Sequence, residues 1–136
     1  MEGHGINYLA VFVAAVAYMA LGALWYSPAL LGRTWMRLIG KTREQVAADF
    51  KAVNYLWAII AAFLASYGIA RLMLWTGLTG VGEAIKLAVL VGISFVLAAM
   101  WVNDSFEARP RALTLVNVVY HVVGLIIVAI ILGLWG

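Results

Sequence analysis

Four long apolar stretches constrain the fold of this chain more than any other feature. A helix needs about 20 residues to cross the hydrocarbon core of a bilayer, and four segments reach that length. They cover residues 6–26, 54–75, 81–102 and 112–135. Hydrophobic residues make up 66% of the 136-residue chain and charged residues 11%, which is more apolar surface than a soluble domain of this size can bury. We therefore predict an all-α integral membrane protein: a transmembrane four-helix bundle that forms a single domain over residues 1–136, with the lipid bilayer as its main partner.

Basic residues predict how the bundle sits in the membrane. Five lysines and arginines lie between the first two apolar stretches and two more between the third and fourth, whereas the other side has only Arg71 and Lys86. Cytoplasmic loops carry such an excess of positive charge. We expect a multi-pass protein of the inner or plasma membrane with both termini extracytoplasmic. The formal charge of +3 is too small and too scattered to predict a nucleic-acid partner.

The loop between the first two spans contains signals for two short helices. Trp35 and Met36 lie beside Arg33 and Arg37, a mixture typical of a helix in the membrane interface. Glycine 40 should end this helix. Thr42 and Gln45 have the spacing of a capping box, which predicts a second short helix beginning at residue 43.

A polar face interrupts the fourth span. Asn117, Tyr120 and His121 are separated by three and four positions, so they share one side of a helix. His121 lies about 14 Å from the cytoplasmic end of the span at 1.5 Å per residue, near the centre of the hydrocarbon layer. Lipid offers no hydrogen-bond partners at that depth, so the face should contact protein or a water-filled cavity.

Two interpretations of this face remain open. In the first, the protein is an oligomeric transporter or channel-like protein, and Asn117, Tyr120, His121 and Ser94 line a substrate or proton pathway; histidine suits it because its charge changes near neutral pH. In the second, the protein is a non-transporting scaffold or accessory subunit, and the face only fixes helix packing, with His121 bonded to Ser94, Ser66 or Tyr18. The sequence favours packing because no span carries an acidic residue at the depth of His121. The sequence does not indicate which small molecule or ion such a transporter would carry.

A second polar cluster follows the third span. Asp104, Glu107, Arg109 and Arg111 fall within the short loop expected before the fourth span. Two acids and two bases this close are expected to pair with one another at the cytoplasmic interface. Alternatively, Glu107 and Arg109 line the mouth of a cavity or bind a lipid headgroup or small anion.

Small residues recur at helical spacing in three spans. Ala58, Ala62, Ser66 and Ala70 form one such stripe, which allows helices to approach closely. We expect these stripes to pack the bundle and, because four helices enclose little interior, some of them to form a homo-oligomer.

The sequence has no cysteine and no intramembrane nucleophile with a base, carboxylate pair or metal set. We therefore expect no enzyme activity, no metal and no cofactor.

Two segments resemble the signatures of a known family. The first is Gly22-Ala-Leu-Trp-Tyr-Ser-Pro28, followed by Gly32 and Trp35-Met36; the second is Phe106-Glu107 with Arg109-Pro110, then Leu115, Asn117 and Tyr120. Together with the ending at residues 131–135 they resemble the prokaryotic membrane family called domain of unknown function 1761. Val119 departs from the pattern, which has a small residue before Tyr120. The resemblance covers essentially the whole chain and implies a four-helix membrane protein without implying an activity.

Overall fold

The computed structural model describes residues 5–135 and confirms the all-α prediction, with four long apolar helices that can span a membrane. The spans are α1 (Tyr8–Trp25), α4 (Ala52–Thr76), a third span running from Val81 to Phe106, and α7 (Arg111–Trp135). Two short helices, α2 (Gly32–Ile39) and α3 (Arg43–Asp49), lie between the first two spans. The bounds differ from those predicted by a few residues at most ends, because hydrophobic length determines where a span lies but not where its last turn stops.

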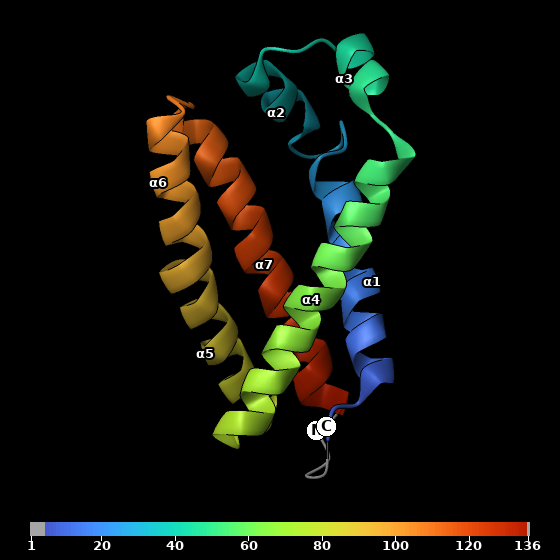
Figure 1. The fold of residues 1–136 in the computed structure, drawn as a ribbon, viewed down its shortest axis with the longest axis vertical. Helices are drawn as coiled ribbons and strands as arrows, with labels where there is room; N and C mark the ends of the chain where they lie inside the picture. Colours follow the sequence, from blue (N-terminus) through green and yellow to red (C-terminus); the bar gives the residue numbers. More distant parts are fainter. Residues whose placement is uncertain (1–4, 136) are drawn as a thin grey trace.

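The spans run alternately up and down, so the connections gather at two ends (Figure 1). One end carries α2, α3 and the turn from α6 (Ala98–Phe106) to α7; we call it the basic end, because both lysine- and arginine-rich loops lie there. The opposite end carries the start of α1, the α4–α5 turn and the end of α7. The chain thus places its two basic loops on the same side of the bundle, as four crossings require.

Helix α7 is the centre of the bundle. It packs against α1 on one side and against α5 (Val81–Val91) on the other, while α1 also packs against α4. Small residues occupy these contacts and are buried: Ala10 and Ala14 of α1, Ala62, Ser66 and Ala70 of α4, and Ala84 and Ala88 of α5. Most members of the predicted stripes therefore serve contacts within one chain, where small side chains let the backbones approach. A homo-oligomer stays a prediction.

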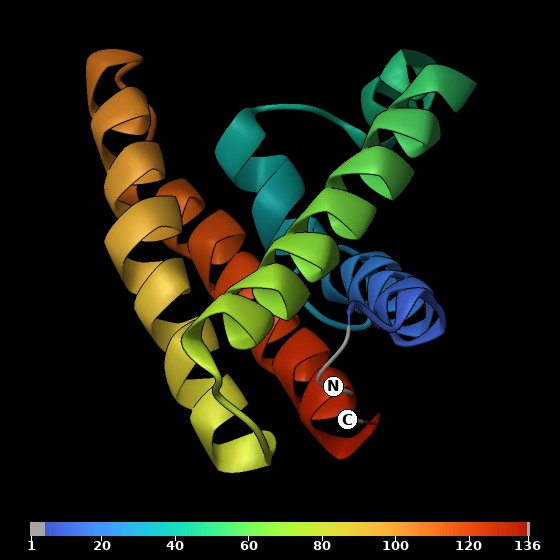
Figure 2. The same cartoon turned by 60° about the horizontal axis from the view of Figure 1, so that its bottom comes forward.

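The first half of α4 leans away from the other spans. It crosses the bundle obliquely (Figure 2), and residues 52–61 are all exposed, Ala58 of the predicted stripe included. Its large side chains include Tyr55 and Trp57, which are 57% and 62% exposed. Apolar groups so exposed are the expected surface of a protein whose solvent is lipid.

The third span differs from the single regular helix that the sequence predicted. Six residues, Gly92–Leu97, form a π-helical stretch (η1) between α5 and α6. A Cβ at Gly92 would lie 3.0 Å from Val122 Cγ2 on α7, so this wider turn begins at a close contact between the two helices. Short π segments are usually local insertions in an α-helix. The pattern of hydrophobic residues does not predict a π-helical segment.

The short helices of the basic end follow their local signals. Gly40 ends α2 with φ of 72°, a left-handed conformation that favours glycine. The Thr42 hydroxyl accepts from the Gln45 amide, and the Gln45 side chain accepts from the Thr42 amide. This pair confirms the predicted capping box.

Candidate functional site

The polar face of α7 is turned toward α1. His121 Nδ1 lies 2.6 Å from the hydroxyl of Tyr18, which is only 6% exposed. Tyr18 was one of three partners considered for His121. Of the other two, Ser94 is exposed on η1, and Ser66 is fully buried on α4 with no hydrogen-bond partner for its Oγ among the residues that the structure describes. The structure therefore brings His121 to Tyr18 and leaves Ser94 outside this contact.

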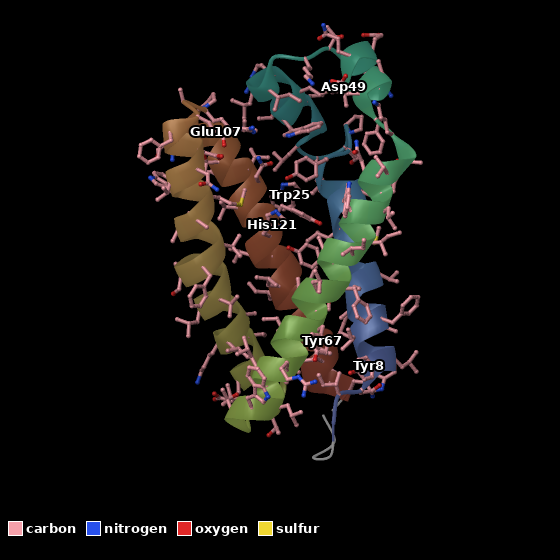
Figure 3. All side chains as sticks on the ribbon, in the orientation of Figure 1. Tyr8, Trp25, Asp49, Tyr67, Glu107 and His121 are labelled. Carbon is pink, nitrogen blue, oxygen red and sulfur yellow. The ribbon has the colours of Figure 1, made fainter. Side chains whose placement is uncertain are left out.

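Asn117 and Tyr120 also bond to α1. The Tyr26 hydroxyl donates to Asn117 Oδ1 at 2.7 Å, and the Tyr120 hydroxyl donates to the backbone carbonyl of Tyr18 at 3.2 Å. These five side chains, Tyr18, Tyr26, Asn117, Tyr120 and His121, form what we call the α1–α7 polar cluster. It lies between α1 and α7 in the half of the bundle nearer to α2, where Figure 3 labels His121. Each of the three predicted α7 residues has a partner on α1 or on Tyr26, which caps the end of α1.

Two tyrosine rings pack against glycines of the opposite helix. A Cβ at Gly22 would lie 2.8 Å from the Tyr120 hydroxyl oxygen, and a Cβ at Gly124 would lie 2.8 Å from Tyr18 Cε1. Each helix thus offers a tyrosine to a glycine of the other, and in both helices the tyrosine precedes the glycine by four positions. Because α1 and α7 are antiparallel, the same spacing on each produces this reciprocal contact. Only glycine leaves room for a ring at such a distance.

Aromatic rings extend the cluster toward α2. Tyr120 lies edge-on to Tyr18 and to Tyr26, with ring centroids 5.4 Å and 5.5 Å apart, and Tyr26 lies edge-on to Trp35 of α2 at 5.3 Å. Edge-to-face pairs stabilise by about 0.5–1.5 kcal/mol each beyond their buried area. The Trp25 indole N–H also donates to the carbonyl of Val116 at 3.1 Å. The cluster therefore fixes α1, α7 and α2 relative to one another.

Sequence reasoning missed the roles of Tyr26 and Trp35, and it named Tyr18 only as one option. A signal for Tyr18 was present, because Tyr18 with Gly22 and Tyr120 with Gly124 repeat one spacing on two spans. Val119, which departs from the family pattern, is 43% exposed, so the close packing of this turn does not bury that side chain.

The second polar cluster is only partly paired as predicted. Glu107 and Arg109 form an exposed ion pair of 2.9 Å, but Asp104 forms no ion pair with a basic side chain of residues 5–135. It is 8% exposed within α6 and accepts a 2.7 Å hydrogen bond from the Thr114 hydroxyl of α7. Placing Asp104 in a loop was wrong: α6 continues to Phe106, because Thr114 satisfies the carboxylate within the helix contact. The Arg111 guanidinium lies over the Trp101 ring, 4.4 Å from its centroid.

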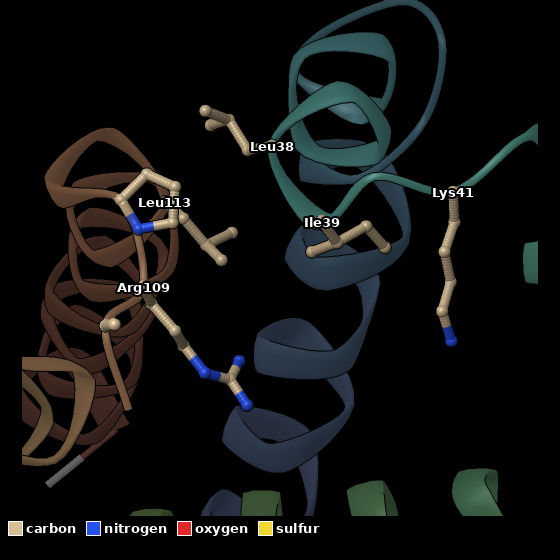
Figure 4. A pocket seen from close by; sticks show the side chains of 7 residues that line it. Leu38, Ile39, Lys41, Arg109 and Leu113 are labelled. Carbon is tan, nitrogen blue, oxygen red and sulfur yellow. The ribbon is translucent and has the colours of Figure 1, made fainter. Parts of the chain in front are cut away.

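A cavity of about 430 Å³ opens at the basic end between α2 and the α6–α7 turn. Leu38 and Ile39 line it from α2 and Leu113 from α7, and Lys41 and Arg109 stand at its edge (Figure 4). Among residues 5–135, no three histidine, aspartate or glutamate side chains lie close enough to hold a metal ion. The candidate site therefore has two parts: the buried α1–α7 polar cluster and this open cavity.

Comparison with known proteins gives one match. The model of a family described as "Protein of unknown function (DUF1761)" matches residues 9–133, nearly the whole chain, which confirms the resemblance. No curated protein and no solved structure matches the sequence. The two segments that carry the resemblance meet in the structure, since Gly22 and Tyr26 of the first contact Tyr120 and Asn117 of the second.

Proposed function

We propose that this chain, which belongs to the DUF1761 family of proteins of unknown function, is a non-transporting and non-enzymatic membrane protein, a lipid-interacting scaffold or accessory subunit. In this proposal the polar face of α7 serves to fix α7 against α1. The observation that carries it is the pairing of all three polar side chains: Asn117 with Tyr26, and Tyr120 and His121 with Tyr18. A solute pathway needs polar groups that are available to the solute, whereas here α1 already occupies them.

The position of His121 supports the same conclusion. It lies ten positions after Arg111, about 15 Å along the axis of α7, so its ring is well inside the span. Intramembrane hydrogen bonds contribute about 0.6 kcal/mol on average, and leaving a buried donor or acceptor without its partner costs about 1–3 kcal/mol. Tyr18 is therefore a structural partner for a side chain that lipid cannot satisfy.

Replacing His121 by leucine separates the scaffold from a transporter. We expect His121→Leu to lower the free energy of unfolding in detergent by about 1 kcal/mol, because the Tyr18 hydroxyl loses its partner. Ser94→Leu is the matched control: it also replaces a polar residue by leucine within a span, but at an exposed position. We expect this control to leave stability unchanged.

The same variants are then placed in proteoliposomes with a pH-sensitive dye inside and an imposed membrane potential. We expect the wild-type protein to give no proton flux above that of protein-free vesicles. A wild-type flux that His121→Leu abolishes, without any loss of stability, would refute the scaffold and restore the pathway interpretation.

The proposal includes an orientation in which both termini are extracytoplasmic. Seven of the nine lysines and arginines belong to the two loops of the basic end. Four acidic residues accompany them there, Glu44, Asp49, Asp104 and Glu107, so this end keeps an excess of positive charge. Lysine and arginine near span ends are retained on the cytoplasmic side.

A further inference from the structure

We propose that the cavity at the basic end binds the headgroup of an anionic phospholipid, with the Arg109 guanidinium on the lipid phosphate. The site lies outside the α1–α7 polar cluster and uses none of its residues. The inference deepens the proposed function, on which it rests, by naming the class of lipid that a lipid-interacting scaffold would hold.

The cavity combines apolar walls with cations. Leu38, Ile39 and Leu113 form an aliphatic surface, and Figure 4 shows Lys41 and Arg109 on either side of Ile39. At about 430 Å³ the cavity is many times larger than the roughly 30 Å³ that one water occupies in the liquid and falls within the usual range of ligand sites. A small soluble anion would leave the aliphatic wall unused. A phospholipid uses both, because its phosphate meets the cations and its glycerol and first methylenes meet the wall.

Arg109 has the geometry for a phosphate. Its Nε donates to Glu107 at 2.9 Å, so the ion pair uses one edge of the guanidinium and leaves its two terminal amino groups outside that bond. Those groups can bind two phosphate oxygens at once, which arginine does better than lysine. The Glu107 pair is no obstacle: both side chains are about half exposed, and exposed pairs contribute only about 0–1 kcal/mol.

Lys41 supplies a second positive charge, which is also held only by an exposed ion pair. It pairs with Asp49 of α3, and both side chains are largely exposed. Such a pair is weak and screened by salt, so a phosphate at the cavity can share the ammonium. Glu107 and Asp49 thus pair with the two cations without burying them.

The turn that presents Arg109 is held in an uncommon backbone conformation. Ala108 has φ of 56°, the left-handed region that glycine normally takes at a helix end. The Arg109 amide donates to the Asp104 carbonyl at 2.9 Å and closes this turn. Left-handed alanine costs about 1–2 kcal/mol, and backbone strain of this kind gathers at ligand sites. This turn brings Arg109 to the cavity.

The depth of the cavity matches a headgroup. Leu113 is the third residue of α7, and Arg109 precedes that helix, so the cavity lies within one turn of the end of a membrane span. Amphipathic α2, with Arg33 and Arg37 exposed, lies beside it. Basic pockets at the ends of spans bind anionic lipid headgroups.

Native mass spectrometry of the purified protein in detergent tests the site, with dioleoyl phosphatidylglycerol, dioleoyl phosphatidylcholine and inorganic phosphate as probes. We expect wild-type protein to bind phosphatidylglycerol more tightly than phosphatidylcholine. Arg109→Gln should weaken phosphatidylglycerol binding about tenfold, the loss of roughly one charge-assisted contact. Arg109→Lys, which keeps the charge and loses the planar fork, should recover only part of that loss.

Arg37→Gln is the matched control, because it removes the same charge from an exposed position on α2 at the same end of the bundle. We expect it to change the affinity by less than about twofold. Equal losses for Arg37→Gln and Arg109→Gln would overturn the site in favour of general surface charge. Equal binding of both lipids, or binding of inorganic phosphate as tight as that of phosphatidylglycerol, would overturn the choice of ligand.

The unfolding midpoint of each variant without lipid shows whether it is folded. The lipid-binding and flux experiments have independent outcomes. A proton flux would refute the scaffold without changing lipid affinity, whereas failure of lipid binding would not alter the structural role of the α1–α7 polar cluster.

Discussion

Replacing Gly124 by alanine tests whether the Tyr18 ring rests on α7. The added Cβ would lie 2.8 Å from Tyr18 Cε1 and 3.0 Å from both Cδ1 and Cζ, well inside the optimal separation of about 3.5–4.0 Å between carbon atoms. The ring has little room to retreat, because it is buried and its hydroxyl is bonded to His121. We expect the substitution to push α1 and α7 apart or to turn the ring out of its rotamer.

Two opposing terms determine the size of the effect. Overpacking costs about 1–3 kcal/mol, whereas alanine is more favourable than glycine inside a helix by about 0.5–1 kcal/mol. Gly68→Ala measures the second term alone, since Gly68 lies within α4 and an added Cβ meets nothing within 4 Å. The difference between the two variants therefore isolates the overpacking. We expect Gly124→Ala to be less stable than Gly68→Ala by about 1–3 kcal/mol.

The free energy of unfolding is measured by adding SDS to protein in mixed micelles. Far-UV circular dichroism reports helix, and tryptophan fluorescence reports the surroundings of Trp25, whose ring lies 6.4 Å from that of Tyr120. Gly22→Ala gives an internal ranking: its Cβ would meet the hydroxyl end of Tyr120, a ring less buried than that of Tyr18, so its cost should be the smaller one. A Gly124→Ala variant within about 0.5 kcal/mol of Gly68→Ala, the range of inconsequential substitutions, would refute the reasoning.

Two further predictions concern the basic end and the orientation. Thr114→Val should lower the free energy of unfolding by about 1–3 kcal/mol, because it leaves the buried Asp104 carboxylate without its donor; Thr79→Val, at an exposed position of the α4–α5 turn, is the control, and equal stability of the two variants would contradict the contact. The sequence has no cysteine, so single cysteines report topology cleanly: an impermeant maleimide added to whole cells should label Thr79→Cys and spare Ala47→Cys of α3, and the reverse pattern would invert the orientation.

The spans and short helices were predictable because their signals are local. Hydrophobic length identifies a span, Gly40 ends α2 through its own backbone conformation, and Thr42 with Gln45 begins α3 through bonds within three residues. None of these signals depends on which helices become neighbours.

The π-helical stretch and the partner of His121 depend on that choice of neighbours. The third span widens at Gly92, where Val122 of α7 approaches, and the sequence of one span does not reveal the surface of another. His121 had three polar candidates on three helices, and antiparallel packing of α1 against α7 decided among them. The equal tyrosine–glycine spacings on α1 and α7 are a signal that the sequence carries and that our prediction did not use.

The buried cluster and the open cavity share structural elements. Trp35 of α2 packs on Tyr26 at the cluster, while Leu38 and Ile39 of the same helix line the cavity. The first two turns of α7 also serve both, because Leu113 lines the cavity four positions before Asn117 of the cluster. A ligand that binds only the folded protein raises its free energy of unfolding, by about 2.7 kcal/mol at a concentration one hundred times its Kd. That is as large as the overpacking cost at Gly124, so the glycine variants are to be compared at one fixed concentration of anionic lipid.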